Sequence, residues 1–382
     1  MARKLRMGMI GGGTGSFIGD VHRKAAAIDG MIELVCGAFS STADKSIASG
    51  KALFLDESRC YGTFEEMILK EKELPEDIRM DFVSIVTPNH MHFPPAKMAL
   101  ENGFNVVCDK PITLTLDEAV ELKEIIKKSN KIFALTHNYT GHPMVKQAKA
   151  MIENGELGKI RKVQVQYIQG WLATDKESEG HKQAAWRVDP KRSGIGGGLG
   201  DIGTHAENLV EYVTGLKIIE LAADLSTFGK GRVLDDDGHL LLRLEGGAKG
   251  IMSFSQIAVG EENNLAIKVY GEKGSLHWEQ ENPNKLTTKW LDKPNKVYTP
   301  MGNDLYPEAL SISRIPIGHP EGYLEAFATI YRNFANHLMA KIDGESVDKT
   351  DYPTVDDGIR GMQFIYAAVE SNTNNSKWTK IK

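Results

Sequence analysis

The sequence predicts an α/β domain with a parallel sheet, followed by an α+β domain with a mostly antiparallel sheet. In the first third, short and nearly all-apolar runs alternate with helical patterns, which is typical of a parallel sheet covered on both faces. From about Ile218 to Lys289 the chain instead shows successive strand patterns separated by glycine-containing turns, which favours antiparallel pairing. We place the boundary after residue 136, which gives domains 1–136 and 137–382.

Apolar runs and helix-end signals define the elements of the first domain. The predicted strands are Leu5–Ile10, Ile32–Phe39, Asp81–Val86, Phe104–Cys108 and Lys131–Leu135. The predicted helices are Asp20–Asp29, Pro95–Asn102 and Leu116–Asn130. Acidic residues begin the last of these helices and lysines end it, as the helix dipole prefers.

The second domain is predicted to combine helices with the run of strands. Its helices are Met144–Asn154, Ile202–Thr214, Tyr323–Met339 and Val355–Ser371, and its first strand is Arg161–Gln169. Helices segregated from strands in this way indicate an α+β domain.

Composition excludes several classes of function. The 382 residues carry a net charge of -5, which gives no reason to expect nucleic acid or an anionic membrane as a partner. No apolar run approaches the roughly 18 residues that a membrane span needs. The basic start is not followed by the apolar region of a signal peptide, so we expect a cytoplasmic protein. Three cysteines without CxxC spacing favour reduced thiols, at Cys36, Cys60 and Cys108.

A glycine-rich turn follows the first strand. Glycines let the backbone approach a pyrophosphate, and the next helix points its free N–H groups at the phosphates. Gly11 and Gly13 fit the first two glycines of G-x-G-x-x-G, and we interpret Gly19 as a displaced third glycine. The alternative is a purely structural turn. The predicted cofactor contacts here are Gly11, Gly13, Thr14, Gly15, Ser16 and Gly19.

The end of the second strand bears on the choice between NAD and NADP. An NAD site usually has Asp or Glu here to bind the ribose diol. The sequence has Ser40 and Ser41 instead, with Lys45 close behind, and these residues suit a 2′-phosphate. We therefore predict NAD or NADP as cofactor, with NADP favoured; the alternative is that the hydroxyls only cap a helix.

Three further segments carry a family resemblance. These are Thr87-Pro88-Asn89-His90-Met91-His92, Asp109-Lys110-Pro111 and Gly200-Asp201-Ile202-Gly203-Thr204-His205. Together with the glycine turn, they resemble the Gfo/Idh/MocA family of oxidoreductases over essentially the whole chain. The resemblance implies a Rossmann domain followed by an α+β domain with a large open sheet. It also implies oxidation or reduction of sugars, inositols and related polyols with NAD or NADP.

The resemblance also assigns residues. Asp109-Lys110-Pro111 matches the family's E-K-P motif with a shorter acid, and Asp201 with His205 matches D-x-x-x-H. The resemblance places near the nicotinamide ribose the matching residues Thr87, Pro88, Asn89 and His92, and assigns Asp109 and Lys110 to cofactor binding as well. The longer glycine turn departs from the family pattern.

Hydride transfer from an alcohol needs a group that accepts the hydroxyl proton. Asp201 and His205 are four residues apart near a helix start and share one face. We predict His205 as the proton acceptor, Asp201 as its support, and Lys110 as the group that polarises the substrate oxygen, although Lys110 and His205 could exchange roles. Alternatively, Asp201 and His205 together bind two sugar hydroxyls. The structural alternatives are a solvated lysine, a capping aspartate and a core or surface histidine.

Aromatic and polar side chains that suit a sugar complete the predicted site. These candidate substrate contacts are Tyr139, His142, Trp171, Trp186 and Arg187, each of which could equally serve packing. His90-x-His92, and Asp201 with His205, have usable metal spacing, but no other cluster completes a site, so we expect no metal.

The sequence also allows two other functions, and it predicts an oligomer. A redox-neutral enzyme that retains its nucleotide, and a non-catalytic nucleotide or sugar sensor, would both suit the same fold. The sensor needs no proton acceptor, so Lys110 and His205 argue against it. An open sheet face would need covering, which predicts a homodimer or homotetramer.

Overall fold

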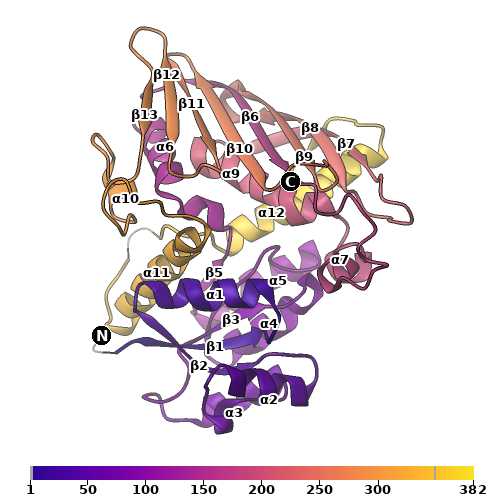
Figure 1. Ribbon diagram of the computed structural model, residues 1–382, viewed down its shortest axis with the longest axis vertical. Helices are drawn as coiled ribbons and strands as arrows, with labels where there is room; N and C mark the ends of the chain where they lie inside the picture. The colour runs from indigo at the N-terminus through magenta and orange to yellow at the C-terminus, as the bar shows by residue number, and fades with distance from the viewer. Residues whose placement is uncertain (1–2, 348–349) are drawn as a thin grey trace. The chain divides into compact units, whose positions relative to one another are not determined.

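The apolar runs of the first third form a five-stranded parallel sheet in the order β2-β1-β3-β4-β5 (Figure 1). The computed structural model describes residues 3–347 and 350–382. The strands are β1 (Leu5–Gly11), β2 (Ile32–Ala38), β3 (Phe82–Val86), β4 (Asn105–Cys108) and β5 (Phe133–Leu135). Their buried, nearly all-apolar sequences explain why both faces are covered. The predicted Rossmann-type α/β domain is thus confirmed.

Helices cover both faces of this sheet. They are α1 (Phe17–Ile28), α2 (Ala43–Ala52), α3 (Phe64–Glu73), α4 (Phe93–Glu101), α5 (Leu116–Ser129) and most of α11 (Tyr323–Ile342). Right-handed crossovers place α1 on one face and α3 to α5 on the other, because the strand order reverses between β1 and β3. Such a reversal is where open α/β sheets bind their ligands.

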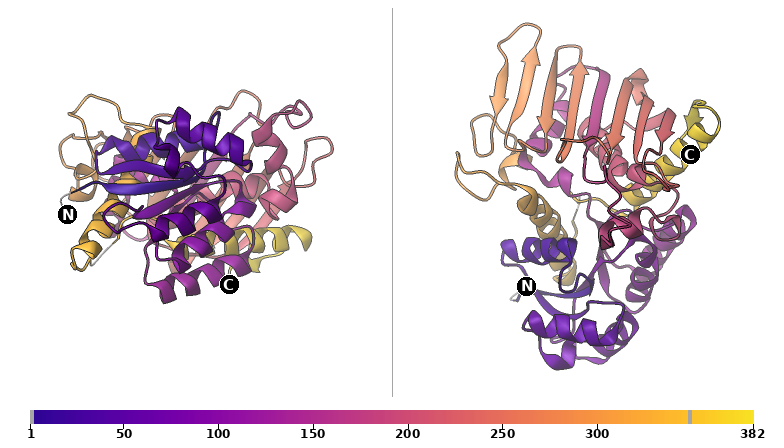
Figure 2. Two further views of the ribbon diagram at one scale, coloured as in Figure 1. Left: turned by 90° about the horizontal axis from the view of Figure 1, so that it is seen from below. Right: turned by 45° about the vertical axis from the view of Figure 1, so that its right-hand side comes forward.

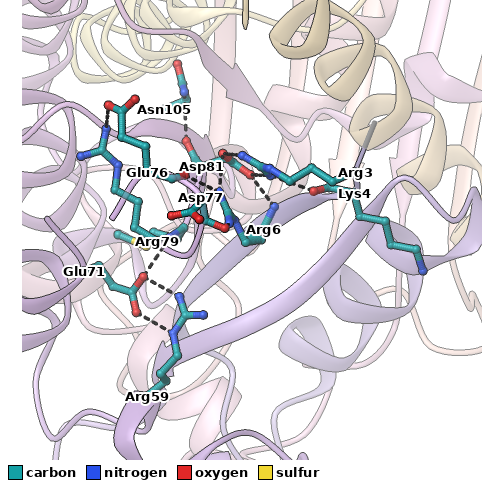
Figure 3. A network of polar contacts seen from close by, with 11 residues as sticks. Arg3, Lys4, Arg6, Arg59, Glu71, Glu76, Asp77, Arg79, Asp81 and Asn105 are labelled. Carbon is teal, nitrogen blue, oxygen red and sulfur yellow. Dashed lines mark hydrogen bonds and ion pairs between the residues drawn. The ribbon is translucent and has the colours of Figure 1, made fainter. Parts of the chain in front are cut away.

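The amino-terminal edge of this sheet is stabilised by buried charges (Figure 3). Arg6 in β1 donates to the carbonyl oxygens of Glu76 and Asp77, and Asp81 accepts the Arg6 backbone N–H at 2.7 Å. Nearby, the fully buried Glu71 accepts two hydrogen bonds from Arg59, at 2.9 and 2.6 Å. These ionic groups are therefore committed to structure at the edge opposite the glycine turn.

A nine-stranded sheet forms the second half of the molecule, in the order β13-β12-β11-β10-β6-β9-β8-β7-β14 (Figure 2). Its strands are β6 (Ile160–Ile168), β7 (Ile218–Ser226), β8 (Asp237–Leu244), β9 (Lys249–Ser255), β10 (Asn264–Gly271), β11 (Gly274–Glu279), β12 (Leu286–Trp290), β13 (Lys296–Tyr298) and β14 (Thr379–Lys380). All neighbouring pairs are antiparallel except β6 with β9, which is parallel. The predicted mostly antiparallel sheet is confirmed.

The remaining helices accompany this sheet. They are α6 (Pro143–Glu153), α7 (Lys182–Arg187), α8 (Pro190–Ser193), α9 (Thr204–Thr214), α10 (Pro307–Leu310) and α12 (Val355–Thr373). Helices α6 and α9 pack against each other and against the sheet. Within the described residues, no helix is long and apolar enough to cross a membrane.

The chain divides into two compact units, of which neither is one continuous segment. Unit 1 contains Met1–Asn138 and Phe327–Ile359, and unit 2 contains Tyr139–Ala326 and Arg360–Lys382. The sequence predicted that the chain passes only once from the first domain to the second, after residue 136. The structure instead adds residues 327–359, including most of α11, to unit 1, because their apolar side chains pack on its sheet.

Candidate active site

The glycine turn joins β1 to α1 in unit 1. Gly11, Gly12 and Gly15 have φ of +82°, +72° and +81°, a region that only glycine adopts readily. A Cβ on Gly19 would lie 2.3 Å from the Gly12 Cα, so α1 approaches the turn as closely as its backbone allows. This contact gives Gly19 the packing role of a third glycine, displaced along the chain by the longer turn.

The tip of the turn fits a dinucleotide diphosphate. Thr14 and Gly15 are exposed, and a Cβ on Gly15 would meet no atom within 4 Å, so the backbone there is open to a ligand. Ser16 caps α1, accepting the Gly19 N–H at 3.3 Å. The helix N-terminus thus begins directly behind the open turn, which is the arrangement that binds phosphate.

Helix α2 fixes the other side of the turn. The Gly13 N–H donates to the Phe39 carbonyl at 3.1 Å, and the Thr14 N–H donates to Ser49 Oγ at 3.2 Å. Ser46 Oγ accepts the Phe39 N–H at 2.7 Å. Ser46 and Ser49 were not predicted from the sequence, where their three-residue spacing, which places both on one helical face, was the only available signal.

Within the described residues, the polar side chains at the tip of β2 have no hydrogen-bond or ion-pair partner. Ser40 is half-buried, whereas Ser41 and Lys45 are exposed. Helix α2 is capped by Thr42 rather than by either serine, and Thr42 makes no side-chain cap hydrogen bond. The helix-capping alternative therefore does not account for Ser40 and Ser41.

The loops after β3 and β4 are joined to each other. His92 Nδ1 lies 2.6 Å from the Pro111 carbonyl oxygen, and His92 Nε2 lies 2.8 Å from that of Thr87. Burial lowers the pKa of His92, and a neutral ring carries one N–H, so it donates to one of these oxygens at a time. His92 thus connects the Thr87–His92 segment to the Asp109–Pro111 segment, and neighbouring Asn89 is buried.

Asp109 organises the backbone at the end of β4. Its Oδ1 accepts the Lys110 N–H at 2.9 Å and the Thr136 hydroxyl at 2.8 Å. Lys110 is half-buried and its peptide bond to Pro111 is cis. The loop thereby carries Lys110 at the carboxyl end of a parallel strand, where sheets of this type bind ligands.

Two buried histidines, His22 and His137, interact with this loop, and neither was predicted from the sequence as a site residue. Burial lowers the pKa of His22 to about 4, although Asp109 opposes the shift. Burial and then the positive charge of Lys110 lower the pKa of His137 to about 3. Both rings are therefore neutral near pH 7.

In unit 2, Asp201 lies in a π-helical turn (Leu199–Gly203) that leads directly into α9. Its Oδ2 accepts Arg187 Nε at 3.0 Å and Gln256 Nε2 at 2.8 Å. Arg187 stacks over the Trp186 ring at 4.3 Å, with Trp171 at 5.7 Å. The predicted residues Trp171, Trp186, Arg187 and Asp201 thus form one cluster, and Gln256 is a member that the sequence did not indicate.

His205 lies in the first turn of α9 and is buried among aromatic rings. The Tyr139 ring meets it edge-on, with 4.8 Å between centroids. Tyr139 Oη lies 2.5 Å from Tyr167 Oη, and Tyr167 donates to Asn263 at 2.8 Å. Burial raises the pKa of Tyr139 to about 12, so this hydroxyl stays neutral. The ring contacts define the orientation available to His205.

His142 lies deeper in unit 2. Its ring stacks on Tyr139 and packs against Trp278, and burial lowers its pKa to about 3. Among the described residues, no group of three or more His, Cys, Asp or Glu side chains is arranged to bind a metal ion.

Both halves of this chain match models of one protein family. A family model described as "Oxidoreductase family, NAD-binding Rossmann fold" matches residues 5–137, and a model of the GFO/IDH/MocA C-terminal domain matches residues 145–277. The chain is 36% identical to the uncharacterized oxidoreductase YfiI from Bacillus subtilis (strain 168), covering 100% of this chain and 98% of the relative.

Two further relatives carry more informative descriptions. A levoglucosan dehydrogenase from Pseudarthrobacter phenanthrenivorans is 27% identical over 99% of this chain and 98% of its own. The crystal structure of an inositol dehydrogenase homolog from Azotobacter vinelandii, complexed with NADH and myo-inositol, is 35% identical with a TM-score of 0.93, covering 100% of this chain and 98% of that one. With its glycine turn, its Asp109-Lys110-Pro111 loop and its Asp201/His205 pair, this chain belongs to the Gfo/Idh/MocA family of NAD-binding oxidoreductases.

Proposed function

We propose that this oxidoreductase transfers a hydride to or from a secondary alcohol carbon of a sugar, inositol or related polyol. The observation that supports it most is the Asp109-Lys110-Pro111 loop at the end of β4, held by His92 and Thr136. The names of the relatives, which include a levoglucosan dehydrogenase and a complex with NADH and myo-inositol, support the same substrate class. Unit 1 is proposed to bind the dinucleotide, and unit 2 the polyol.

In the proposed reaction, different residues handle the proton, the cofactor and the substrate. The nicotinamide, when bound, accepts or supplies the hydride. His205 takes the hydroxyl proton and Lys110 polarises the substrate oxygen, while Asp201 supports His205. Gly11, Gly13, Gly15 and Ser16 hold the diphosphate, with Thr14 and Gly19 shaping the turn. Thr87, Pro88, Asn89, His92 and Asp109 are proposed to border the nicotinamide ribose. Tyr139, His142, Trp171, Trp186 and Arg187 are proposed to border the polyol.

Substitution of the two proton-handling groups tests this function. Lys110→Met and His205→Asn should each lower kcat on the order of 100-fold or more with myo-inositol and NAD⁺. Lys97→Met, at an exposed lysine paired with Glu121, is the matched control and should leave kcat unchanged. Full activity in Lys110→Met would refute the proposed role of Lys110. Product formation without net change in nicotinamide absorbance would instead support the redox-neutral alternative.

We further propose that the β2 tip accepts a 2′-phosphate, so that NADP binds at least as well as NAD. Ser40, Ser41 and Lys45 have no competing role there, and no carboxylate follows β2 directly to repel a phosphate. Fluorescence titration with NADH and NADPH measures this directly. Weaker NADPH binding would contradict the proposal, and Lys45→Met should weaken NADPH binding while leaving NADH binding unchanged.

The assembly is proposed to be a homodimer or homotetramer formed through the unit 2 sheet. The face that α6 and α9 leave uncovered carries apolar side chains that are 47%, 51% and 45% exposed, namely Ile219, Leu241 and Ile251. Such a patch on an open sheet favours burial against a second copy. Light scattering that gives the mass of a monomer would refute this proposal.

We also propose a cytoplasmic location, supported by three buried, unpaired cysteines and testable by cell fractionation.

A further inference from the structure

A line of polar groups runs through the buried interior of unit 1 and ends at Asp109. Ser84 Oγ in β3 lies 2.7 Å from Tyr331 Oη in α11, and Tyr331 Oη lies 2.8 Å from His22 Nδ1 in α1. On its other side, His22 Nε2 lies 3.9 Å from Asp109 Oδ1. Ser84, Tyr331 and His22 are each at most 1% exposed. None of these three residues belongs to the motifs that carry the family resemblance.

The direction of these hydrogen bonds follows from the charge of Asp109. A buried neutral imidazole has one N–H, and its other nitrogen carries a lone pair. A lone pair on Nε2 would face the carboxylate and be repelled, so Nε2 carries the hydrogen. His22 Nδ1 then accepts from the Tyr331 hydroxyl, and the Ser84 hydroxyl donates to Tyr331.

His22 and Asp109 are close but not hydrogen-bonded. A distance of 3.9 Å is too long for a hydrogen bond, and His22 Nε2 has no hydrogen-bond partner in the described part of the chain. The same Asp109 Oδ1 is taken by the Lys110 N–H and by Thr136. His22 therefore acts on Asp109 through the field of its N–H dipole, which attracts the carboxylate without competing for those two hydrogen bonds.

We propose that His22, oriented by Tyr331 and Ser84, is a positioning residue that holds the Asp109 carboxylate against the Lys110 amide. It thereby sets the backbone from which the Lys110 side chain extends. This inference rests on the proposed function for its catalytic consequence, since Lys110 is the proposed polarising group. Its structural content, the His22 tautomer and the Lys110 amide contact, can be measured without any turnover.

The test compares two tyrosines that each bond a histidine in unit 1. Tyr331→Phe removes the nearer donor to His22 Nδ1 and leaves only Ser84 Oγ, at 3.4 Å. Tyr352→Phe removes the contact of Tyr352 Oη with His337 Nδ1, which is 2.6 Å long. Nitrogen-15 NMR of the histidine rings reports the tautomer, and hydrogen exchange reports the Lys110 amide. Both are measured on the full-length protein.

We expect wild-type His22 to carry its hydrogen on Nε2. Tyr331→Phe should populate the Nδ1–H form and speed exchange of the Lys110 amide about threefold to tenfold, the effect of weakening one hydrogen bond. Tyr352→Phe should change neither signal. A hydrogen on Nδ1 in the wild type, or equal Lys110 exchange in the two variants, would overturn the inference and leave the buried groups as core packing.

Turnover separates this inference from the proposed function. With myo-inositol and NAD⁺, Tyr331→Phe should lower kcat, whereas the same change in a Lys110→Met background should cause no further loss. An equal loss in both backgrounds would overturn the link from His22 to Lys110. If Lys110→Met alone keeps full kcat, the function proposed for Lys110 fails, while the tautomer and exchange measurements still decide the positioning of Asp109.

Discussion

Single residues determine how closely the backbone can approach a ligand, and Gly19 is the clearest case. Its Cα faces Gly12, with no room for a methyl group. Because the obstacle is backbone, neither a rotamer change nor a flexible neighbour can relieve it. The glycine at position 19 is therefore required by contact with the turn and not by its own φ.

Gly19→Ala should weaken NADH binding more than tenfold and lower stability by about 1–3 kcal/mol, the usual cost of overpacking. Gly30→Ala is the control, because Gly30 has φ +70° but open space around its Cβ. It should cost about 1–2 kcal/mol of backbone strain and leave NADH binding unchanged. Fluorescence titration and urea unfolding measure both. Wild-type NADH affinity in Gly19→Ala would contradict the assigned role.

Arg187 offers a second residue-scale prediction, because it pairs with Asp201 and stacks on Trp186. Arg187→Met should lower kcat about tenfold or more by removing a guanidinium that binds the Asp201 carboxylate, with little effect on NADH binding. Arg243 is a matched control, since it pairs with Glu220 and lies 3.8 Å from the Trp378 ring centroid, at strand β8. Steady-state kinetics that show the same loss for Arg243→Met would point to general destabilisation.

The sequence offers candidate site residues wherever a local motif carries them, and offers none whose partners are distant along the chain. Gly19 and His205 stand in recognisable patterns. The hydrogen-bond partner of His22 is Tyr331, which lies 309 positions further along the chain, so no local spacing in the sequence could connect the two residues. Ser49 and Gln256 were missed for the same reason. Their function depends on which segments the fold brings into contact.

At the scale of elements, the π-helical turn Leu199–Gly203 is held by a carboxylate from another segment. Asp235 Oδ1 accepts the Gly197 N–H at 2.9 Å, and Oδ2 accepts the Leu199 N–H at 2.6 Å. A Cβ on Gly197 would lie 2.2 Å from the Asp235 carbonyl oxygen, so the glycine is needed for this close approach. The turn that carries Asp201 is thus supported at its entry.

Asp235→Asn should loosen that turn, because one carboxylate oxygen becomes an NH₂ group that opposes a backbone N–H. We expect a loss of about 1–3 kcal/mol in stability from the unpaired amide, and a lower kcat with unchanged NADH affinity. Asp224→Asn, at an exposed position of β7, is the control and should change neither. An unaltered kcat would show that the turn does not depend on Asp235.

Element boundaries were predictable where capping chemistry was local. Helix α5 runs from Leu116 to Ser129 with a capping box between Thr115 and Glu118, close to the predicted span. The span of helix α2 was not predicted, because its buried face carries Ser46, Ser49 and Gly50 in place of an apolar stripe. The parallel pairing of β6 with β9 was also missed, since pairing between distant strands leaves no trace in their spacing.

At the scale of the whole molecule, buried neutral histidines make stability depend on pH. Burial lowers the pKa of His22 to about 4, and those of His137 and His142 to about 3. The unfolded chain, with histidine near its usual value of about 6.5, binds more protons between these limits. Their contribution to stability is therefore present above pH 6.5 and is lost as the pH falls.

Urea midpoints at pH 7.5 and pH 5 measure this dependence, and the midpoint should be lower at pH 5. Asp235 has the opposite sign, because burial raises its pKa to about 6 and its contribution is lost as pH rises through that value. Three histidines outweigh this one carboxyl, and Asp235→Asn should steepen the decline towards pH 5. An equal or higher midpoint at pH 5 would contradict the prediction.

The division of unit 1 between two stretches of chain has a consequence for biosynthesis. Phe327 and Tyr331 contact His22, and Phe334 packs on Phe82 of the parallel sheet. These side chains leave the ribosome only after residues 139–326 have been translated. During translation, the first 138 residues must therefore remain without α11, which completes the cover of one sheet face. We expect a truncated polypeptide that ends there to associate with chaperones or aggregate, and unit 1 to form only once residues 327–359 have been translated.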